Sequence, residues 1–150
     1  MKLRGAKFAD AEEILGLINT FAEKGLMLQR SRSTIYEHIR EFLIIENEEN
    51  IIAVGSLHII WGDLAEIRAL AVSEQYQRQG LGKRLVEALL GEAKELGCPR
   101  IFTLTYQPEF FERCGFKLIN KDEMPQKVWK ECIHCVKFPN CDENAMILDL

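Results

Sequence analysis

The sequence predicts an α/β fold, with a mixed central sheet and helices on both of its faces. Three observations lead to this prediction. Residues 10–25 and 80–97 carry apolar side chains at helical spacing, and residues 42–72 hold apolar runs rich in β-branched residues. The last of these runs is followed by the second helical segment and then by a buried apolar run at 101–105. A strand–helix–strand order of this kind predicts a right-handed parallel crossover.

The N-terminal part is predicted to start with a short strand at residues 3–6, followed by a helix. Asp10 has the residue type of an N-cap, and Glu13 three residues later completes a capping-box pattern. Gly25 lies where that helix is expected to end. A basic loop follows, and then a short helix at about residues 34–40.

A three-stranded meander is predicted next. Residues 42–46 and 51–60 read as the two strands of a hairpin, because the polar segment 47–50 separates them. A second turn at Gly62-Asp63 leads into a third strand at 65–72. Beyond the meander we expect a long helix, a buried strand, a short helix, a strand, and a final edge or closing strand: residues 80–96, 101–105, 108–114, 116–119 and 145–150.

The totals limit the class of protein. A chain of 150 residues fits one domain, which we expect to span 1–150. No apolar run approaches the roughly 18 residues of a membrane span and no signal peptide is evident, so we expect a cytoplasmic protein that does not bind membranes. A net charge of −4 argues against nucleic acid as a partner. The oligomeric state is left open, a homodimer included.

The most informative segment is the turn at residues 77–83, Gln77-Arg78-Gln79-Gly80-Leu81-Gly82-Lys83. It lies between a predicted strand and a long helix, so backbone N–H groups at the helix N-terminus and the helix dipole favour an anion there. Gly80 and Gly82 let the backbone approach a phosphate closely. Two glycines alone are equally compatible with a tight turn that binds nothing.

This turn resembles the Arg/Gln-x-x-Gly-x-Gly/Ala signature of the GNAT superfamily of acetyltransferases. The segments 66–72 and 110–116 resemble that superfamily's fourth strand and its aromatic helix-to-strand turn, and the similarity follows the family order along nearly the whole chain. The resemblance implies the GNAT acyl-CoA N-acyltransferase fold and acetyl-CoA as cosubstrate. Its pyrophosphate would lie on residues 77–83, and its pantetheine arm along Leu70, Ala71 and Val72. In the superfamily a bulge interrupts the fourth strand, but no residue here signals one.

Acetyl transfer to an amine requires removal of a proton from the amine and stabilisation of the thioester carbonyl oxygen. Glu66 is the candidate base, although a solvent-exposed strand glutamate without a catalytic role would fit the sequence equally well. The N–H of Leu70 is the expected donor to the carbonyl oxygen. Many family members carry a tyrosine where this chain has Phe111, which cannot protonate the leaving thiolate. Either the thiolate leaves without a proton donor, or Tyr106 donates a proton to it. Tyr106 is equally compatible with a purely packing role.

The loop at residues 28–32, Leu28-Gln29-Arg30-Ser31-Arg32, resembles the Val-Arg-Arg-Ser-Arg loop in the acetyltransferase domain of bacterial N-acetylglutamate synthases. The resemblance implies an amino-acid acceptor, L-glutamate first, and a place in arginine biosynthesis. Arg30 is the preferred carboxylate ligand because a guanidinium offers a bidentate fork. His58 lies at a position that resembles a substrate-facing lysine in some relatives and is a further substrate-binding candidate, although a lone histidine is more often structural. Arg32 is a weaker candidate. The synthases usually carry a kinase-like domain as well, so we expect a stand-alone short form.

Two other functions remain open on the sequence. One is a GNAT acetyltransferase for another small amine or a protein N-terminus, and the other is a non-catalytic acetyl-CoA-binding regulatory module. The five cysteines, an odd number, predict reduced thiols. Cys132, Cys135 and Cys141, with His134, could hold zinc, form a redox pair or remain thiols, and the sequence does not decide among these.

Overall fold

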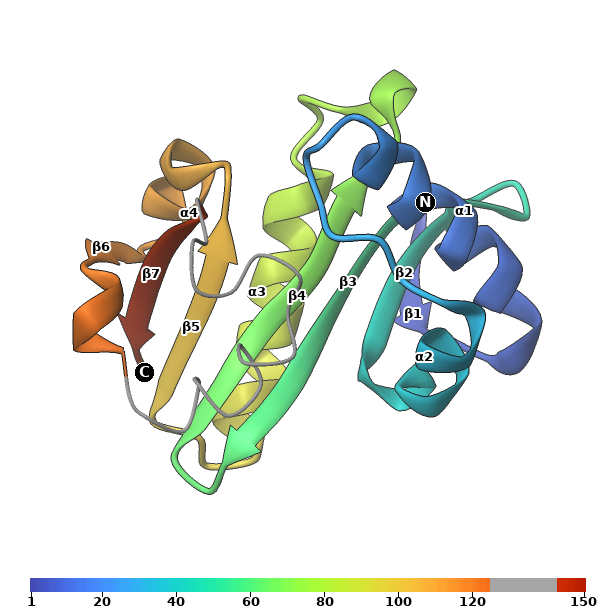
Figure 1. The fold of residues 1–150 in the computed structure, drawn as a ribbon. Coiled ribbons are helices and arrows are strands. Elements are labelled where there is room, and N and C mark those ends of the chain that lie inside the picture. Colours follow the sequence, from blue (N-terminus) through green and yellow to red (C-terminus); the bar gives the residue numbers. More distant parts are fainter. Residues whose placement is uncertain (125–142) are drawn as a thin grey trace. The chain divides into compact units, whose positions relative to one another are not determined.

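The computed structural model describes residues 1–124 and 143–150. In this part of the chain, seven strands form one mixed sheet in the order β1-β2-β3-β4-β5-β7-β6, and helices accompany it (Figure 1). The predicted α/β class is confirmed. The helices and strands, in chain order, are β1 (Lys2–Gly5), α1 (Ala11–Glu23), α2 (Arg32–Glu37), β2 (Phe42–Asn47), β3 (Asn50–Trp61), β4 (Leu64–Val72), α3 (Leu81–Glu95), β5 (Arg100–Thr105), α4 (Pro108–Arg113), β6 (Lys117–Ile119) and β7 (Asn144–Asp149). Single 3₁₀ turns lie at Phe8–Asp10, Ile39–Glu41, Glu74–Tyr76 and Lys121–Glu123.

The described chain divides into two compact units. The first comprises residues 1–57 and 67–91, and the second comprises residues 58–66 and 92–150. A single domain over 1–150 stays a prediction.

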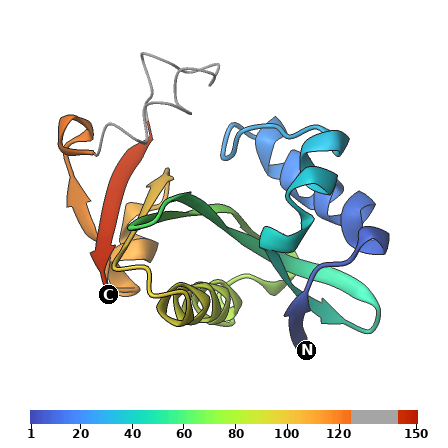
Figure 2. The same cartoon turned by 90° about the horizontal axis from the view of Figure 1, so that it is seen from below.

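The first unit is built on antiparallel strands with helices on both sides. β1 pairs with β2 from Lys2↔Glu46 to Gly5↔Leu43, and β2 pairs with β3 as the predicted hairpin. Figure 2 shows α1 and α2 on one side of these strands and the N-terminal part of α3 on the other. The two-sided cover explains why β2 reads as a continuous apolar run rather than an alternating one.

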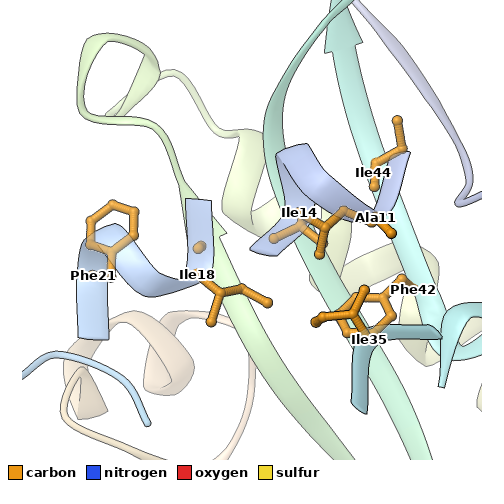
Figure 3. Packing of buried hydrophobic residues seen from close by; sticks show 9 residues of the cluster. Ala11, Ile14, Ile18, Phe21, Ile35, Phe42 and Ile44 are labelled. Atoms are coloured by element: carbon orange, nitrogen blue, oxygen red, sulfur yellow. The ribbon is translucent and has the colours of Figure 1, made fainter. Parts of the chain in front are cut away.

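The core of this unit lies between α1, α2 and the strands. Ile14 and Ile18 of α1 are fully buried, one helical turn apart, and pack with Ile35 of α2 and Phe42 of β2 (Figure 3). Each such side chain contributes about 1.5–3 kcal/mol when it is removed from water. This packing fixes the orientation of α1, and therefore the direction of its other side chains.

The predicted start of α1 is confirmed, but the predicted capping box is wrong. Asp10 precedes the helix in helical backbone conformation, and its side chain makes no cap hydrogen bond. Its carboxylate instead accepts from both terminal nitrogens of Arg4, at 2.7 and 3.0 Å, and from the N–H of Lys7 at 2.8 Å. Glu13 accepts from the N–H of Ile51 at 3.0 Å rather than reaching back to the helix start.

An Asp10→Asn variant tests this ion cluster. The Arg4 guanidinium, by hydrogen bonding, holds the pKa of the Asp10 carboxyl below its usual range. Because the pKa of Asp10 is lower in the folded state, its ionised carboxylate stabilises the protein at pH values above the unfolded-state pKa of about 4. This stabilisation is lost as the pH falls through the folded-state pKa. We expect the variant to lose about 1–3 kcal/mol at pH 7 and the difference from wild type to narrow toward pH 3. Urea unfolding at both pH values measures it. Replacing the exposed Glu37 with glutamine is the control, and a difference that stays constant with pH would speak against the cluster.

The second unit holds the parallel pairing and the C-terminal strands. β4 and β5 pair in parallel through Ala65↔Ile101 and Glu66↔Phe102, which confirms the predicted parallel arrangement. β7 pairs antiparallel with β5 along its whole length and also with β6. The final strand is thus an inner strand of the sheet, not an edge, and β6 lies at the margin. Leu64, Phe102, Met124 and Ala145 form a buried hydrophobic cluster in this unit.

Candidate functional site

The turn at residues 77–83 lies at the start of α3, as predicted. Two residues of it have left-handed backbone conformation, Arg78 with φ +66° and Gly80 with φ +81°. Helix α3 begins at Leu81, and the first helical bond at this end runs from the N–H of Arg84 to the carbonyl of Gly80 at 3.0 Å. Helix geometry leaves the N–H groups before Arg84 without intrahelical acceptors. A left-handed turn that leads into a helix N-terminus is therefore suited to an anionic group.

Side chains in the same unit anchor the start of this turn. Gln77 donates from Nε2 to the carbonyl of Val72 at 2.9 Å, so its carboxamide ties the turn to the end of β4. The hydroxyl of Tyr76 accepts from the amide of Asn47 at 3.3 Å, and Glu74 forms an ion pair with Lys24. Arg78, Gln79 and Lys83 are exposed, whereas Leu81 is buried and fixes the first turn of α3.

β4 is interrupted just before the residues expected to bind the pantetheine arm. Ala69 has φ +55°, a left-handed conformation in the middle of a strand. Such a residue breaks the regular alternation of backbone groups along a strand. The side chain of Leu70 lies over Gly55, where an added Cβ would come within 3.1 Å of its Cδ1 atom. Leu70 is thus held by packing directly after an irregular residue.

A Gly80→Ala variant separates ligand binding from conformational strain. Its φ of +81° disfavours a side chain, although an added Cβ would meet nothing within 4 Å. The direct cost is therefore backbone strain of about 1–2 kcal/mol. We expect the KM for acetyl-CoA to rise about 5- to 10-fold and the KM for the acceptor to stay within about twofold, because strain here disturbs the donors that a phosphate needs.

Gly97→Ala is the matched control for this experiment. Gly97 follows the other end of α3 with φ +78° and equally open surroundings, so the backbone strain is matched. An equal rise in the KM for acetyl-CoA in both variants would show that strain alone, not the turn, is responsible.

In the second unit, the structure places the predicted catalytic side chains on β4 and after β5. Glu66 lies on β4 with 8% exposure, so it is not the solvated strand glutamate that the sequence left open. Tyr106 follows β5 directly and is half-buried. Phe111 is buried, with its ring edge-on to Phe110 at 5.1 Å and to Phe116 at 5.3 Å. Position 111 is therefore part of the apolar packing of α4.

The arginine loop lies between α1 and α2 in the first unit. Arg30 is half-buried and Arg32 is exposed. The guanidinium of Arg32 hydrogen-bonds the carboxylate of Glu12 on α1, with 3.1 Å between Nη2 and Oε2. This pairing lowers the pKa of Glu12 through the hydrogen bond to Arg32. Ser31 caps α2 by accepting from the N–H of Thr34 at 3.2 Å. The loop is thus fixed to both helices that flank it.

The remaining sequence candidates have less structural support. His58 is half-buried on β3, within the second unit. Cys132, Cys135, Cys141 and His134 lie outside the described residues. No helix in the described ranges is long and apolar enough to cross a bilayer.

Two anchoring groups were not singled out from the sequence. The carboxamide of Asn19 on α1 bonds the main chain of Arg30, and the carboxamide of Asn47 bonds Tyr76 beside the phosphate turn. Both are single polar residues in otherwise ordinary segments. Nothing in their spacing signals a partner that is distant in sequence.

Comparison with known proteins places this arrangement among acetyltransferases. The model of the Acetyltransferase (GNAT) family matches residues 10–116. The chain is 39% identical over 148 residues to an uncharacterized N-acetyltransferase of Chlorobaculum tepidum, covering 99% of this chain and 96% of that protein. It is 35% identical over 132 residues to an amino-acid acetyltransferase of Mycobacterium tuberculosis, covering 86% of this chain and 75% of that protein.

A solved structure gives the same placement. The fold matches N-acetylglutamate synthase from Neisseria gonorrhoeae, complexed with coenzyme A and N-acetyl-glutamate, with a TM-score of 0.90 and 31% identity. The match covers 99% of this chain and 35% of the synthase chain.

Proposed function

Because this chain belongs to the GNAT family of acetyltransferases, we propose that it transfers the acetyl group of acetyl-CoA to the α-amino group of an amino acid, with L-glutamate as the preferred acceptor. The observation that carries the proposal is the left-handed turn at Arg78 and Gly80 ahead of α3. It offers main-chain donors and positive charge to the pyrophosphate of acetyl-CoA.

The residues in the turn and in β4 have separate roles in the proposal. Backbone N–H groups of residues 78–83 bind the pyrophosphate, and Gln77 holds the turn to β4. The pantetheine arm pairs with Leu70, Ala71 and Val72. The N–H of Leu70, directly after the left-handed residue Ala69, donates to the thioester carbonyl oxygen as it gains negative charge.

The proposed reaction needs one base and releases one thiolate. Glu66, directly or through a water molecule, removes a proton from the acceptor ammonium. The amine nitrogen then attacks the thioester carbon and a C–N bond forms. The C–S bond breaks as coenzyme A leaves as a thiolate, and the nitrogen gives up its second proton to become a neutral amide. That proton balances the one that the thiolate takes up to become a thiol. Tyr106 is the proposed proton donor to that thiolate, because Phe111 carries no transferable proton.

The arginine loop supports an acidic acceptor. Arg30 supplies a guanidinium that can bind a carboxylate through two parallel hydrogen bonds. Arg32 bonds the carboxylate of Glu12 on α1 and is proposed as a secondary contact for the acceptor. His58 is proposed as a further substrate contact. The complex of the gonococcal synthase with N-acetyl-glutamate supports glutamate as the acceptor. A role in the first step of arginine biosynthesis is part of the same proposal.

Thiol release from acetyl-CoA tests the proposal. The protein is incubated with acetyl-CoA and a panel that contains L-glutamate, L-glutamine, L-aspartate, a polyamine and a peptide with a free N-terminus. We expect the highest kcat/KM for L-glutamate. If only the polyamine or only the peptide is acetylated, the acceptor is that amine and not an amino acid. Binding of acetyl-CoA without acetylation of any amine would indicate a regulatory module.

A further inference from the structure

The main chain of Arg30 is held by a single side chain from α1. The amide nitrogen of Arg30 donates to Oδ1 of Asn19 at 3.2 Å, and Nδ2 of Asn19 donates to the carbonyl oxygen of Arg30 at 3.4 Å. The carboxamide thus bonds both polar groups of one residue, eleven positions away in sequence. This pairing fixes the position of the Arg30 Cα atom and the direction in which its side chain leaves the loop.

Asparagine suits this contact but is unfavourable in the helix that carries it. A carboxamide offers one acceptor and two donors, which is what a residue's N–H and C=O together require. In a helix interior, however, asparagine is less favourable than alanine by up to about 0.7 kcal/mol. Its neighbour Ile18 is fully buried in the core, so α1 presents the Asn19 side chain in a fixed direction.

The rest of the loop is anchored at its two ends. Near α1, the N–H of Leu26 donates to the carbonyl of Phe21 at 3.1 Å, and Met27 packs against the core. At the other end, Ser31 caps α2. Arg30 lies between these anchors, where Asn19 supplies the contacts from α1.

We propose that Asn19 is a positioning residue for the acceptor site: by holding the main chain of Arg30, it sets the position from which the guanidinium binds the acceptor carboxylate. This inference rests on the proposed function, in which Arg30 binds that carboxylate. Preorganisation lowers the entropic cost of ordering a long side chain when the ligand binds. Asn19 itself acts through Arg30 and does not touch the reacting atoms.

Steady-state kinetics of an Asn19→Ala variant tests the inference. We expect the KM for L-glutamate to rise about 5- to 20-fold, while kcat and the KM for acetyl-CoA stay within about twofold. Hydrogen exchange of the Arg30 amide should become faster. Thr20→Ala is the matched control, because Thr20 adjoins Asn19 on the same helix and also loses a side-chain hydrogen bond to the backbone, to the carbonyl of Gly16 at 2.8 Å. Its kinetics should match those of wild type.

A double variant shows whether Asn19 acts through Arg30. In an Arg30→Ala background, the Asn19→Ala change should have less than a twofold effect on the KM for L-glutamate. An effect that persists at full size overturns the inference. The inference is also overturned if Arg30→Ala raises the KM for L-glutamate but Asn19→Ala leaves it unchanged. The proposed function would stand in that case.

A binding measurement keeps the two proposals distinguishable. If the protein turns over no amino acid, the proposed function fails, and L-glutamate is instead titrated into the coenzyme A complex and followed by amide chemical shifts. Weaker binding by Asn19→Ala than by Thr20→Ala then supports the inference. Equal affinities, or no L-glutamate binding by the wild type, overturn it.

Discussion

Replacing Glu66 with glutamine is expected to lower kcat by about 100-fold or more, because general base catalysis typically contributes 10² to 10⁴ in rate. Glutamine keeps the size of the side chain, which matters at a position with 8% exposure, but it cannot accept a proton. The α-amino group of a free amino acid is largely protonated at pH 7, so the deficit should be greatest at neutral pH and shrink as the pH rises. Thiol release between pH 6.5 and 9.5 measures it.

The control for this experiment is Glu109→Gln, which makes the same chemical change at an exposed position of α4. Its pH profile should overlay that of wild type. A Glu66→Gln enzyme with an unaltered kcat over the whole pH range would remove Glu66 as the base and leave its burial as a structural feature only.

Replacing Arg30 with alanine is expected to raise the KM for L-glutamate about 10- to 150-fold, which corresponds to losing about 1.5–3 kcal/mol of charge-assisted hydrogen bonding. The KM for acetyl-CoA should change by less than about twofold, because the turn at residues 78–83 is untouched. Arg30→Lys should recover part of the loss, since lysine keeps the charge but not the planar fork.

Arg113→Ala controls for the loss of one positive charge, because Arg113 is exposed at the end of α4. It should leave both KM values near those of wild type. Parallel increases in the KM for L-glutamate and for acetyl-CoA in Arg30→Ala would indicate a disturbed fold rather than a lost carboxylate contact.

The order of helices and strands was predictable because each element carries its own signal. The helical faces of α1 and α3, the hairpin of β2 and β3, and the parallel pairing of β4 with β5 follow from periodicity and from the strand–helix–strand order. The position of β7 was not predictable, because it depends on which neighbour accepts its backbone hydrogen bonds. The structure inserts it between β5 and β6.

The details of the site were only partly predictable, for a related reason. Glycine at position 80 signals a left-handed turn, but Ala69 and Arg78 adopt the same conformation without any such signal. Asp10 has the residue type of a helix cap, yet Arg4 offers its carboxylate stronger partners. The sequence gives Asn19 no special role, and only its contact with the main chain of Arg30 in the folded structure shows one. Tertiary contacts decide each of these cases.

Amide chemical shifts during a titration with acetyl-CoA test most directly whether the turn ahead of α3 binds the nucleotide. We expect the largest shifts at the N–H groups of residues 78–83, followed by those of Leu70, Ala71 and Val72. The Gly80→Ala variant should need several-fold more acetyl-CoA for half-saturation. Saturable binding whose shifts avoid residues 78–83 would show that the nucleotide binds elsewhere, and the absence of any shift at millimolar acetyl-CoA would show that it does not bind.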